Sequence, residues 1–280
     1  MARGLKLDPI RLQPKQGEFL RAVDDYKVTL YGGAKGGGKS HGLRNVILHR
    51  RFQYPGTIGA VFRRTYPELD ANIIRPLLMQ HPQLEPFYNR SQHIITIPNG
   101  STLEFCYCNT EADLTRYQGR EFHDMGIEEA GQWPEEWFQR LRGSSRSSIE
   151  GIIARIMLTG NPGGIGHKWL KRLFIDRDYN EREVAKHYHF IQALVWDNAA
   201  LIDNDPGYID NLKAEPNEAI RKAYLEGDWD IFAGQYFGEW RREVHVLPER
   251  WKPEPWYKWF GAYDHGFAHP AMFGLFVVDG

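Results

Sequence analysis

A glycine-rich segment ending in lysine and serine, Gly33-Ala-Lys-Gly-Gly-Gly-Lys-Ser40, has the residue types and spacing of a phosphate-binding loop. Glycines allow backbone N–H groups to surround a polyphosphate, and a following helix adds the positive end of its dipole. Lys39 is spaced to reach the β- and γ-phosphates, and the Ser40 hydroxyl is spaced to bind Mg²⁺. We therefore assign to nucleotide binding the residues Gly33, Ala34, Lys35, Gly36, Gly37, Gly38, Lys39 and Ser40.

Two adjacent acids, Glu128 and Glu129, follow a stretch from Phe122 to Ile127 that we interpret as a modest strand interrupted by charge. Hydrolysis of a nucleoside triphosphate uses one acid near Mg²⁺ and another that polarises the attacking water. Adjacent side chains at a strand end diverge with the pleat, so this pair can serve both purposes. We assign Glu128 to the metal and Glu129 to the water, although aspartate is more usual at the first position. Glutamate pairs are also common on solvated helices, and the glycine-rich loop upstream favours the catalytic interpretation.

Two further segments carry candidate binding groups. Thr159-Gly160-Asn161 comes directly after an apolar run from Ile152 to Leu158, where a γ-phosphate could be sensed. The alternative is an ordinary Asn-Pro-Gly turn. Gln16 precedes the loop on a short predicted helix, and its amide can both donate to and accept from an adenine edge. The alternative for Gln16 is an exposed helix residue, and the sequence alone leaves both open.

Short apolar runs and helical spacings predict the elements that hold these residues. Strands are expected at Lys27–Tyr31, Thr57–Phe62, Ile152–Leu158 and His189–Val195, and a helix with Leu43, Val46 and Ile47 follows the loop. Residues Ile94–Ile97 and Thr102–Tyr107 flank Pro98-Asn-Gly-Ser101, which indicates a hairpin. Strands that alternate with helices predict an α/β fold of three layers with a mainly parallel sheet.

Composition excludes several classes of protein. The 280 residues are 42% hydrophobic and 25% charged, with a net charge of −1, so a contact with nucleic acid requires local basic patches. No apolar run approaches the roughly 20 residues of a membrane span, and the amino terminus lacks a signal-peptide core, which argues against secretion. We interpret Cys106 and Cys108 as buried thiols in a reducing compartment, because no further metal ligands accompany them in suitable spacing.

The pattern changes after Asn198. A helical region from Asp203 to Leu225 leads into an aromatic and proline-rich connector, and two strands are then predicted at Trp259–Gly266 and Met272–Val278. We predict a P-loop ATPase domain at residues 1–198, a connecting or lid subdomain at 199–256, and the incomplete start of another domain at 257–280.

In this order the motifs resemble those of the large terminase subunit of tailed bacteriophages, the ATPase of the DNA-packaging motor. The resemblance covers essentially the whole chain and rests on GAKGGGKS, GIEEA, LTGNP, WDN…YLEGDWDIFAGQYFGEW and FGAYDHGFAHP. It implies a P-loop NTPase of the ASCE type, a connector, and the first strands of an RNase H-like nuclease. It also implies that ATP and Mg²⁺ drive double-stranded DNA into procapsids. Gln16 would belong to the adenine-side motif, and Thr159, Gly160 and Asn161 to the motif that couples hydrolysis to DNA movement.

The resemblance further implies an arginine finger, a metal site and partners. Arg63, Arg64, Arg116 or Arg120 could supply the finger, and we favour Arg116 or Arg120 acting from a neighbouring subunit. Asp264 would be the first ligand of a nuclease site for two divalent ions, Mg²⁺ or Mn²⁺, with the remaining acids expected past Gly280.

The implied partners are double-stranded DNA, the portal protein, the small terminase subunit and further copies of the chain in a ring, in the cytoplasm of the bacterial host. The alternatives are another P-loop DNA-dependent ATPase, such as a helicase or a partition ATPase, and a scaffold with a decayed nucleotide site.

Overall fold

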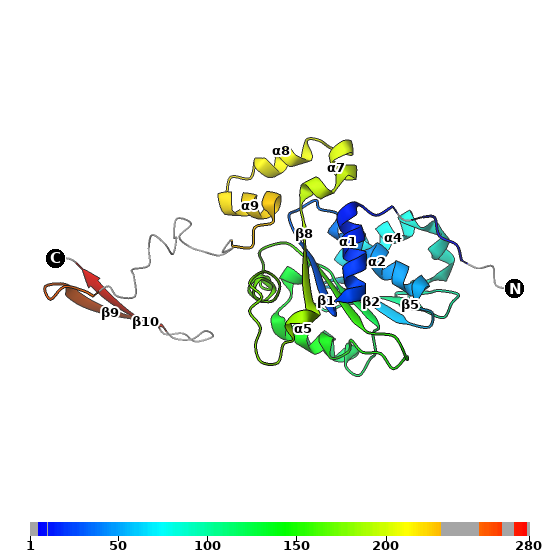
Figure 1. The fold of residues 1–280 in the computed structure, drawn as a ribbon, viewed down its shortest axis with the longest axis horizontal. Coiled ribbons are helices and arrows are strands. Elements are labelled where there is room, and N and C mark those ends of the chain that lie inside the picture. Colours follow the sequence, from blue (N-terminus) through cyan, green and yellow to red (C-terminus); the bar gives the residue numbers. More distant parts are fainter. Residues whose placement is uncertain (1–4, 10, 231–251, 265–271, 279–280) are drawn as a thin grey trace. The chain divides into compact units, whose positions relative to one another are not determined.

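The computed structural model describes residues 5–9, 11–230, 252–264 and 272–278, in two compact units that comprise residues 1–234 and 235–280. The first unit is an eight-stranded sheet covered by helices on both faces (Figure 1). Its strands are β1 (Val28–Gly33), β2 (Ile58–Arg63), β3 (Tyr88–Asn89), β4 (Ile94–Thr96), β5 (Thr102–Tyr107), β6 (Asp124–Ile127), β7 (Arg155–Gly160) and β8 (Tyr188–Ala193). The domain boundaries expected after residues 198 and 256 stay predictions.

The α-helices of this unit connect the strands. They are α1 (Pro14–Asp25), α2 (Lys39–Gln53), α3 (Tyr66–Leu69), α4 (Arg75–Gln80), α5 (Glu135–Arg142), α6 (His167–Leu170), α7 (Ala199–Asn204), α8 (Tyr208–Lys213) and α9 (Glu218–Glu226). Helices α1, α2 and α9 contribute contacts to the site described below. The helical region expected from Asp203 to Leu225 is broken into separate helices. Pro206 and Pro216 lie in the two gaps, where they remove backbone donors, and Asn217 caps α9 by accepting from the Ile220 N–H.

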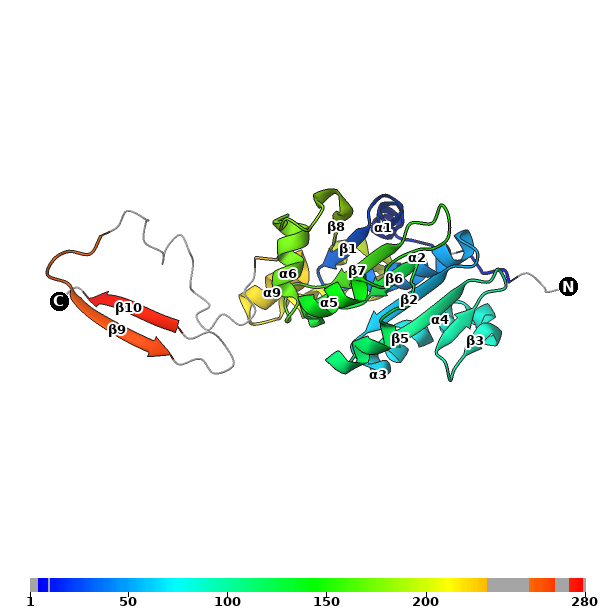
Figure 2. The same cartoon turned by 90° about the horizontal axis from the view of Figure 1, so that it is seen from below.

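The strand order is β3-β4-β5-β2-β6-β7-β1-β8, and neighbouring strands from β5 to β8 are parallel (Figure 2). The predicted α/β class with a mainly parallel sheet is therefore confirmed. The expected hairpin is also confirmed, because β4 pairs antiparallel with β5 and Gly100 takes φ 87° in its turn. Strand β7 begins at Arg155, three residues after the expected start, and runs between β1 and β6. The carboxyl ends of β1, β6 and β7 therefore meet at one edge of the sheet.

Alternating side chains of the central strands build two cores, one on each face of the sheet. On the face covered by α5 and α6 the buried strand residues include Leu30, Phe62, Ile127 and Leu158. On the face covered by α1 and α2 they include Tyr31, Val61, Met157 and Ile191. Burial on both faces is what a parallel sheet between helical layers requires.

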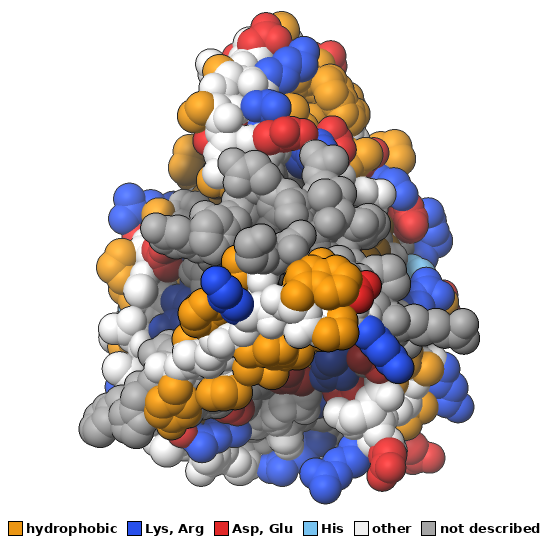
Figure 3. Space-filling view, turned by 90° about the vertical axis from the view of Figure 1, so that its left-hand side faces the viewer, with side chains coloured by type: hydrophobic (Ala, Val, Ile, Leu, Met, Phe, Trp, Pro, Cys, Tyr) orange, Lys and Arg blue, Asp and Glu red, His pale blue; other side chains and the backbone are white. Residues whose placement is uncertain are grey.

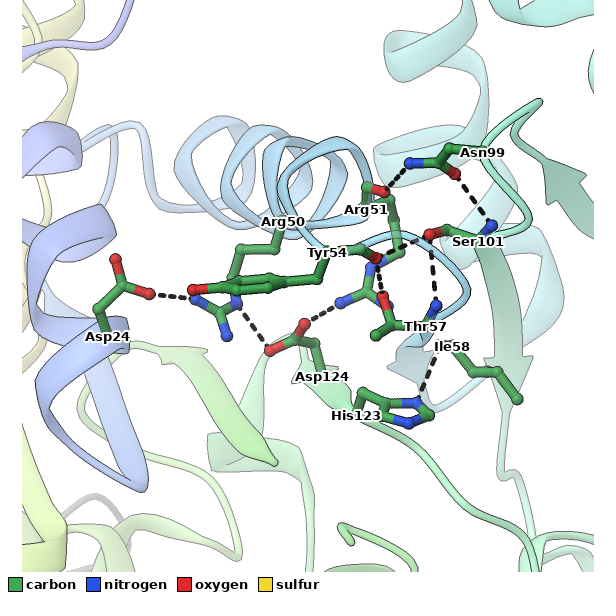
Figure 4. A network of polar contacts seen from close by, with 10 residues as sticks. All are labelled: Asp24, Arg50, Arg51, Tyr54, Thr57, Ile58, Asn99, Ser101, His123 and Asp124. Atoms are coloured by element: carbon green, nitrogen blue, oxygen red, sulfur yellow. Dashed lines mark hydrogen bonds and ion pairs between the residues drawn. The ribbon is translucent and has the colours of Figure 1, made fainter. Parts of the chain in front are cut away.

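A buried ion network fastens the opposite, amino-terminal edge of the sheet (Figure 4). Asp124, the first residue of β6, accepts hydrogen bonds from Arg50 (Nε to Oδ1, 2.7 Å) and from Arg51, both in the last turn of α2. Arg51 also donates to the Thr57 hydroxyl, and Arg50 donates to Asp24 near the end of α1. The Asp124, Arg50 and Arg51 side chains are at most 3% exposed, so the start of β6 is tied to the end of α2 without solvent between them.

The second unit contains an antiparallel pair, β9 (Lys258–Asp264) with β10 (Met272–Val278). Both expected strands are present, and the last two residues of the first expected strand, 265 and 266, lie outside the described residues. Hydrophobic side chains, coloured orange in Figure 3, are exposed on both strands, among them Trp259 (54%) and Phe273 (67%). An RNase H-like domain here stays a prediction. Within the described residues, no helix has the length and apolar character needed to cross a membrane.

Candidate active site

The glycine-rich loop joins β1 to α2 in a conformation that only glycine adopts readily. Gly33, Gly36 and Gly38 have φ values of 136°, 76° and 71°. A Cβ at Gly33 would lie 2.5 Å from the Ala193 carbonyl oxygen, so the loop is in close contact with β8. The Ala34 N–H donates to this same carbonyl (2.7 Å), which fixes the start of the loop.

Three side chains hold the loop from outside it. Gln16 on α1 is 2% exposed, and its Nε2 donates to the Gly38 carbonyl (3.0 Å) while its Oε1 accepts from the Gln13 N–H. Tyr31 donates from its hydroxyl to the Gly37 carbonyl (3.0 Å), and Asn198 donates from Nδ2 to the Gly36 carbonyl (2.7 Å). Gln16 is therefore a buried support of the loop, not the exposed helix residue of the alternative interpretation. A contact between Gln16 and adenine stays a prediction.

Lys39 lies at the start of α2 and is 7% exposed. Its Nζ donates to the Ala34 carbonyl (2.5 Å), so the ammonium group lies against the start of the loop. Burial lowers the pKa of Lys39 to about 8, and the carboxylates of Glu129 and Glu128 oppose that shift. The lysine and both acids are thus within electrostatic reach of one another.

The acids follow directly on β6. Glu128 is 1% exposed and receives the Arg63 guanidinium (Nη1 to Oε2, 2.5 Å), while its Oε1 is buried without a hydrogen-bond partner among the described residues. Glu129 has φ 50° and ψ 53°, a left-handed conformation that is uncommon for a residue with a side chain. Burial raises the pKa of Glu129, and the charge of Lys39 opposes this shift. Strained backbone and a perturbed carboxyl group together are typical of a reactive site.

Strand β7 places the third segment between the loop and the acids. Asn161 donates from Nδ2 to Glu129 Oε2 over 3.5 Å, a long hydrogen bond of the kind that tightens when a substrate binds. The Thr159 hydroxyl and Asn161 Oδ1 are buried and, as far as the structure describes the chain, have no partner. Together with Glu128 Oε1 they form a set of unsatisfied oxygens at one edge of the sheet. Buried polar atoms are rarely left unpaired, so this set indicates a place for a ligand, water or cation.

The loop, the acidic pair and the Asn161 segment thus converge at the carboxyl ends of β1, β6 and β7. The sequence matches the phage terminase large subunit family over residues 25–227. The chain belongs to this family. No curated protein matches the sequence.

Solved terminase structures share the fold. The large terminase of a thermophilic bacteriophage in complex with ADP has a TM-score of 0.59 and 20% identity, over 96% of this chain and 65% of that one. The HK97 bacteriophage large terminase has a TM-score of 0.56 and 14% identity, over 78% of this chain and 50% of that one. A mutant of the Thermus phage P74-26 large terminase ATPase domain has a TM-score of 0.55 and 13% identity, over 79% of this chain and 94% of that one. The chain thus spans about 65% of the length of the ADP-bound terminase.

The four candidate arginines of this terminase subunit lie in different surroundings. Arg63 is bound to Glu128 within the same chain, and Arg64 stacks on Trp137 (4.6 Å) while donating to backbone carbonyls. Arg116 is the most exposed of the four at 56% of its side chain, and pairs with Asp113 (2.9 Å) beyond the carboxyl end of β5. Arg120 is 38% exposed and pairs with the buried Glu104 within β5 (2.7 Å). A finger contributed to a neighbouring subunit stays a prediction for Arg116 and Arg120.

Contacts from the carboxyl-terminal part of the first unit were missed by sequence reasoning. Helix α9 packs on the loop: the Lys35 N–H donates to the Tyr224 carbonyl (2.9 Å), and the Lys35 ammonium lies 3.5 Å from the Tyr224 ring centroid. Gly227, which ends α9 with φ 64°, would place a Cβ 2.7 Å from the Ala34 nitrogen. Asn198 was the other omission, although the Trp-Asp-Asn198 motif was a visible signal for it. Helix α9 thus contacts the glycine-rich loop directly.

The predicted metal ligands lie in two places. Ser40 is the second residue of α2, directly after Lys39, and Glu128 belongs to the site above. Their hydroxyl and carboxylate oxygens are donors of the kind that Mg²⁺ prefers. Asp264 ends β9 in the second unit, but its side chain lies outside the described residues. Within the part of the chain that is described, no three His, Cys, Asp or Glu side chains gather in a metal-binding group. Cys106 and Cys108 are buried free thiols, as expected, and burial raises the pKa of Cys108 to about 12.

Proposed function

We propose that this terminase subunit is the ATP-hydrolysing part of a motor that moves double-stranded viral DNA into procapsids. The observation that carries the proposal is the convergence of Lys39, Glu129 and Asn161 at one edge of the sheet. A charged amine, a carboxylate and an amide in this arrangement fit the three needs of phosphoryl transfer to water. These needs are binding of the triphosphate, activation of water, and detection of the γ-phosphate.

The loop backbone and Lys39 bind the triphosphate. In the free protein the Lys39 ammonium donates to the Ala34 carbonyl, and we infer that phosphate oxygens replace this carbonyl when ATP binds. Ser40 and Glu128 would hold Mg²⁺, and Glu128 Oε1, free of protein partners in the described chain, is the donor we assign to its shell. Bound there, Mg²⁺ supplies positive charge to the β- and γ-phosphate oxygens. Arg63 holds the other oxygen of Glu128 and so orients its carboxylate.

Glu129 acts on the attacking water. Burial raises its pKa, which makes it a stronger base than an exposed glutamate, and the charge of Lys39 opposes that rise. Asn161 donates to the same carboxylate, so a shift of Asn161 toward the γ-phosphate would alter the orientation of Glu129. Thr159, Gly160 and Asn161 would in this way couple the state of the nucleotide to movement of DNA.

The remaining assignments concern partners. Arg116 or Arg120 would stabilise the transition state in a neighbouring subunit of a homo-oligomeric ring. The ring would contact double-stranded DNA, the portal protein and the small terminase subunit, in the cytoplasm of the bacterial host. Asp264 would bind one of two divalent ions in a complete RNase H-like nuclease that cuts concatemeric DNA.

ATP turnover measured with and without double-stranded DNA tests the proposal. Lys39→Ala should abolish turnover, whereas Lys186→Ala, which removes an exposed lysine from the amino-terminal side of β8, should leave it unchanged. DNA-independent turnover, or equal loss in both variants, would contradict a motor built on this site. Packaging by purified procapsids, portal and small subunit then separates a terminase from a helicase, because only a terminase requires the procapsid.

A further inference from the structure

The segment after Asn161 is fastened to the turn that carries Glu129. We call residues 161–166 the coupling loop. The Gly166 N–H donates to the Gly131 carbonyl (2.8 Å), and a Cβ at Gly131 would lie 2.9 Å from the Gly163 carbonyl oxygen. Gly163 and Gly164 have φ values of 104° and 78°, which allow the chain to turn this closely. The coupling loop is therefore in direct contact with the turn that follows Glu129.

One histidine links this loop to a distant part of the sequence. His167 Nδ1 accepts a hydrogen bond from the Gly163 N–H (2.9 Å), and the imidazole stacks on the Trp229 indole (5.7 Å between centroids, 21° between planes). Burial lowers the pKa of His167, and Lys171 lowers it further, which is consistent with Nδ1 acting as an acceptor. A hydrogen bond between the imidazole and the Trp229 backbone opposes this shift and adds a second attachment.

Trp229 is anchored in the first unit directly before the sequence that leads to the second. It is 4% exposed, packs edge-on against Phe190 (6.2 Å between centroids) and follows Gly227, which lies against the phosphate loop. Asp230, the next residue, pairs with Lys171 one helical turn after His167 (3.1 Å). The second unit begins at Gln235. Trp229 and Asp230 are the last residues that the structure describes before residue 252.

We propose that His167 is a positioning residue that holds the coupling loop against Trp229, so that a change at Asn161 is passed on to Trp229. The inference rests on the proposed function, since it requires that Asn161 responds to nucleotide. The path is short and contiguous: Glu129 to Asn161, through the turn at Gly163 to His167, and across the stacked rings to Trp229. Each step is either a direct contact or a turn of a few backbone residues that contains Gly163 and Gly164.

Helix α9 also contacts the nucleotide site, so the test needs a variant that disrupts the His167 contact and leaves the α9 contact intact. The Tyr224 carbonyl accepts from Lys35, so nucleotide could also reach Trp229 through α9. His167→Phe separates the two routes, because it keeps an aromatic ring on Trp229 but removes the acceptor for Gly163. His189→Phe is the matched control, since His189 also stacks on an aromatic ring, Tyr26 (4.2 Å, 9°), but does not contact the coupling loop.

The experiment uses the full chain labelled with 5-fluorotryptophan and observed by ¹⁹F NMR. Trp229→Phe assigns one resonance among those of the nine tryptophans. We expect ATPγS to shift the Trp229 resonance in the unsubstituted protein and in His189→Phe, but not in His167→Phe. The ATPγS affinity of the two variants should stay within about twofold of that of the unsubstituted protein. The kcat for ATP should fall roughly fivefold in His167→Phe, because the loss of one hydrogen bond has an effect of this size. A Trp229 shift that persists in His167→Phe would overturn the proposal.

Hydrogen exchange in the unsubstituted protein keeps the proposal testable if His167→Phe fails to fold. Peptides covering residues 161–166 and 226–230 should both gain protection when ATPγS binds. Protection confined to residues 161–166 would mean that the loop senses nucleotide without passing the change to Trp229, and the proposal would be wrong. Failure of ATPγS to bind at all would instead contradict the proposed function, so the two failures are distinguishable.

Discussion

The pH dependence of nucleotide affinity follows directly from the burial of Lys39. In the free protein the pKa of Lys39 is about 8, because burial disfavours the ammonium more than Glu129 and Glu128 favour it. A triphosphate beside Nζ favours the charged form and raises the pKa again. Binding above pH 8 must therefore be accompanied by uptake of a proton, and affinity falls as pH rises.

The size of this effect can be calculated from the pKa alone. If only protonated Lys39 binds ATPγS, the apparent Kd scales with one plus the ratio of neutral to charged lysine. Between pH 7.5 and pH 9.5 the Kd should then rise about 25-fold, equivalent to about 1.9 kcal/mol of binding free energy. Below pH 7.5 the affinity should be nearly constant with respect to this residue.

Isothermal titration calorimetry at constant ionic strength measures both parts of the prediction. Titrations in two buffers of different ionisation enthalpy report proton uptake directly, and about one proton should be taken up per ATPγS at pH 9.5. Lys35→Ala should keep the dependence but move its onset to higher pH, since Lys35 is one of the charges that lower the pKa of Lys39. A Kd that stays constant from pH 7.5 to 9.5, with no proton uptake, would refute the reasoning.

Three further predictions concern single side chains. Glu129→Gln should bind ATPγS normally but lose ATP turnover, measured by phosphate release. Glu128→Gln should instead lose the Mg²⁺-dependent part of its ATPγS affinity. Near-normal turnover in Glu129→Gln would mean that the two roles are reversed. Asp124→Asn should lower the free energy of unfolding, measured by urea titration, by about 3–5 kcal/mol, since it leaves buried guanidinium groups unpaired. Glu85→Gln, at an exposed ion pair, is the control and should lower it by at most about 1 kcal/mol. If Arg116 acts in trans, mixing Arg116→Ala with Glu129→Gln should restore part of the turnover that each lacks alone, and no restoration in confirmed oligomers would exclude it.

The local features of the site could be predicted from the sequence because each is encoded within a few residues. The P-loop residues follow a fixed spacing, and the Asn-Gly pair of the hairpin sets its own turn. The acids Glu128 and Glu129 were singled out because they follow a modest strand, interrupted by charge, downstream of the glycine-rich loop. In each case the flanking pattern, and not the motif alone, carried the prediction.

The long-range features could not be predicted in this way. The sequence of β7 does not predict that this strand lies between β1 and β6, although this placement brings Asn161 close to Glu129. The pairing of Arg63 with Glu128 joins residues 65 positions apart, and the sequence indicated only that Arg63 was one of several candidate fingers. The link from His167 to Trp229 likewise depends on how two distant segments pack. Spacing within a motif does not contain this information.

The buried ion network explains how the acids can be held in place by so short a strand. Strand β6 has only four residues, so Glu128 lies about 13 Å from Asp124 if the chain is extended. Asp124 is bonded to the last turn of α2, and the first residue of α2 is Lys39. Lys39 therefore lies at the amino-terminal end of α2, and the acids lie at the carboxyl-terminal end of β6. The other ends of these two elements are joined by the ion pairs of Asp124 with Arg50 and Arg51. A tilt of α2 that moved Lys39 would also pull on Asp124, so the spacing between Lys39 and the two acids is set partly at the far edge of the sheet.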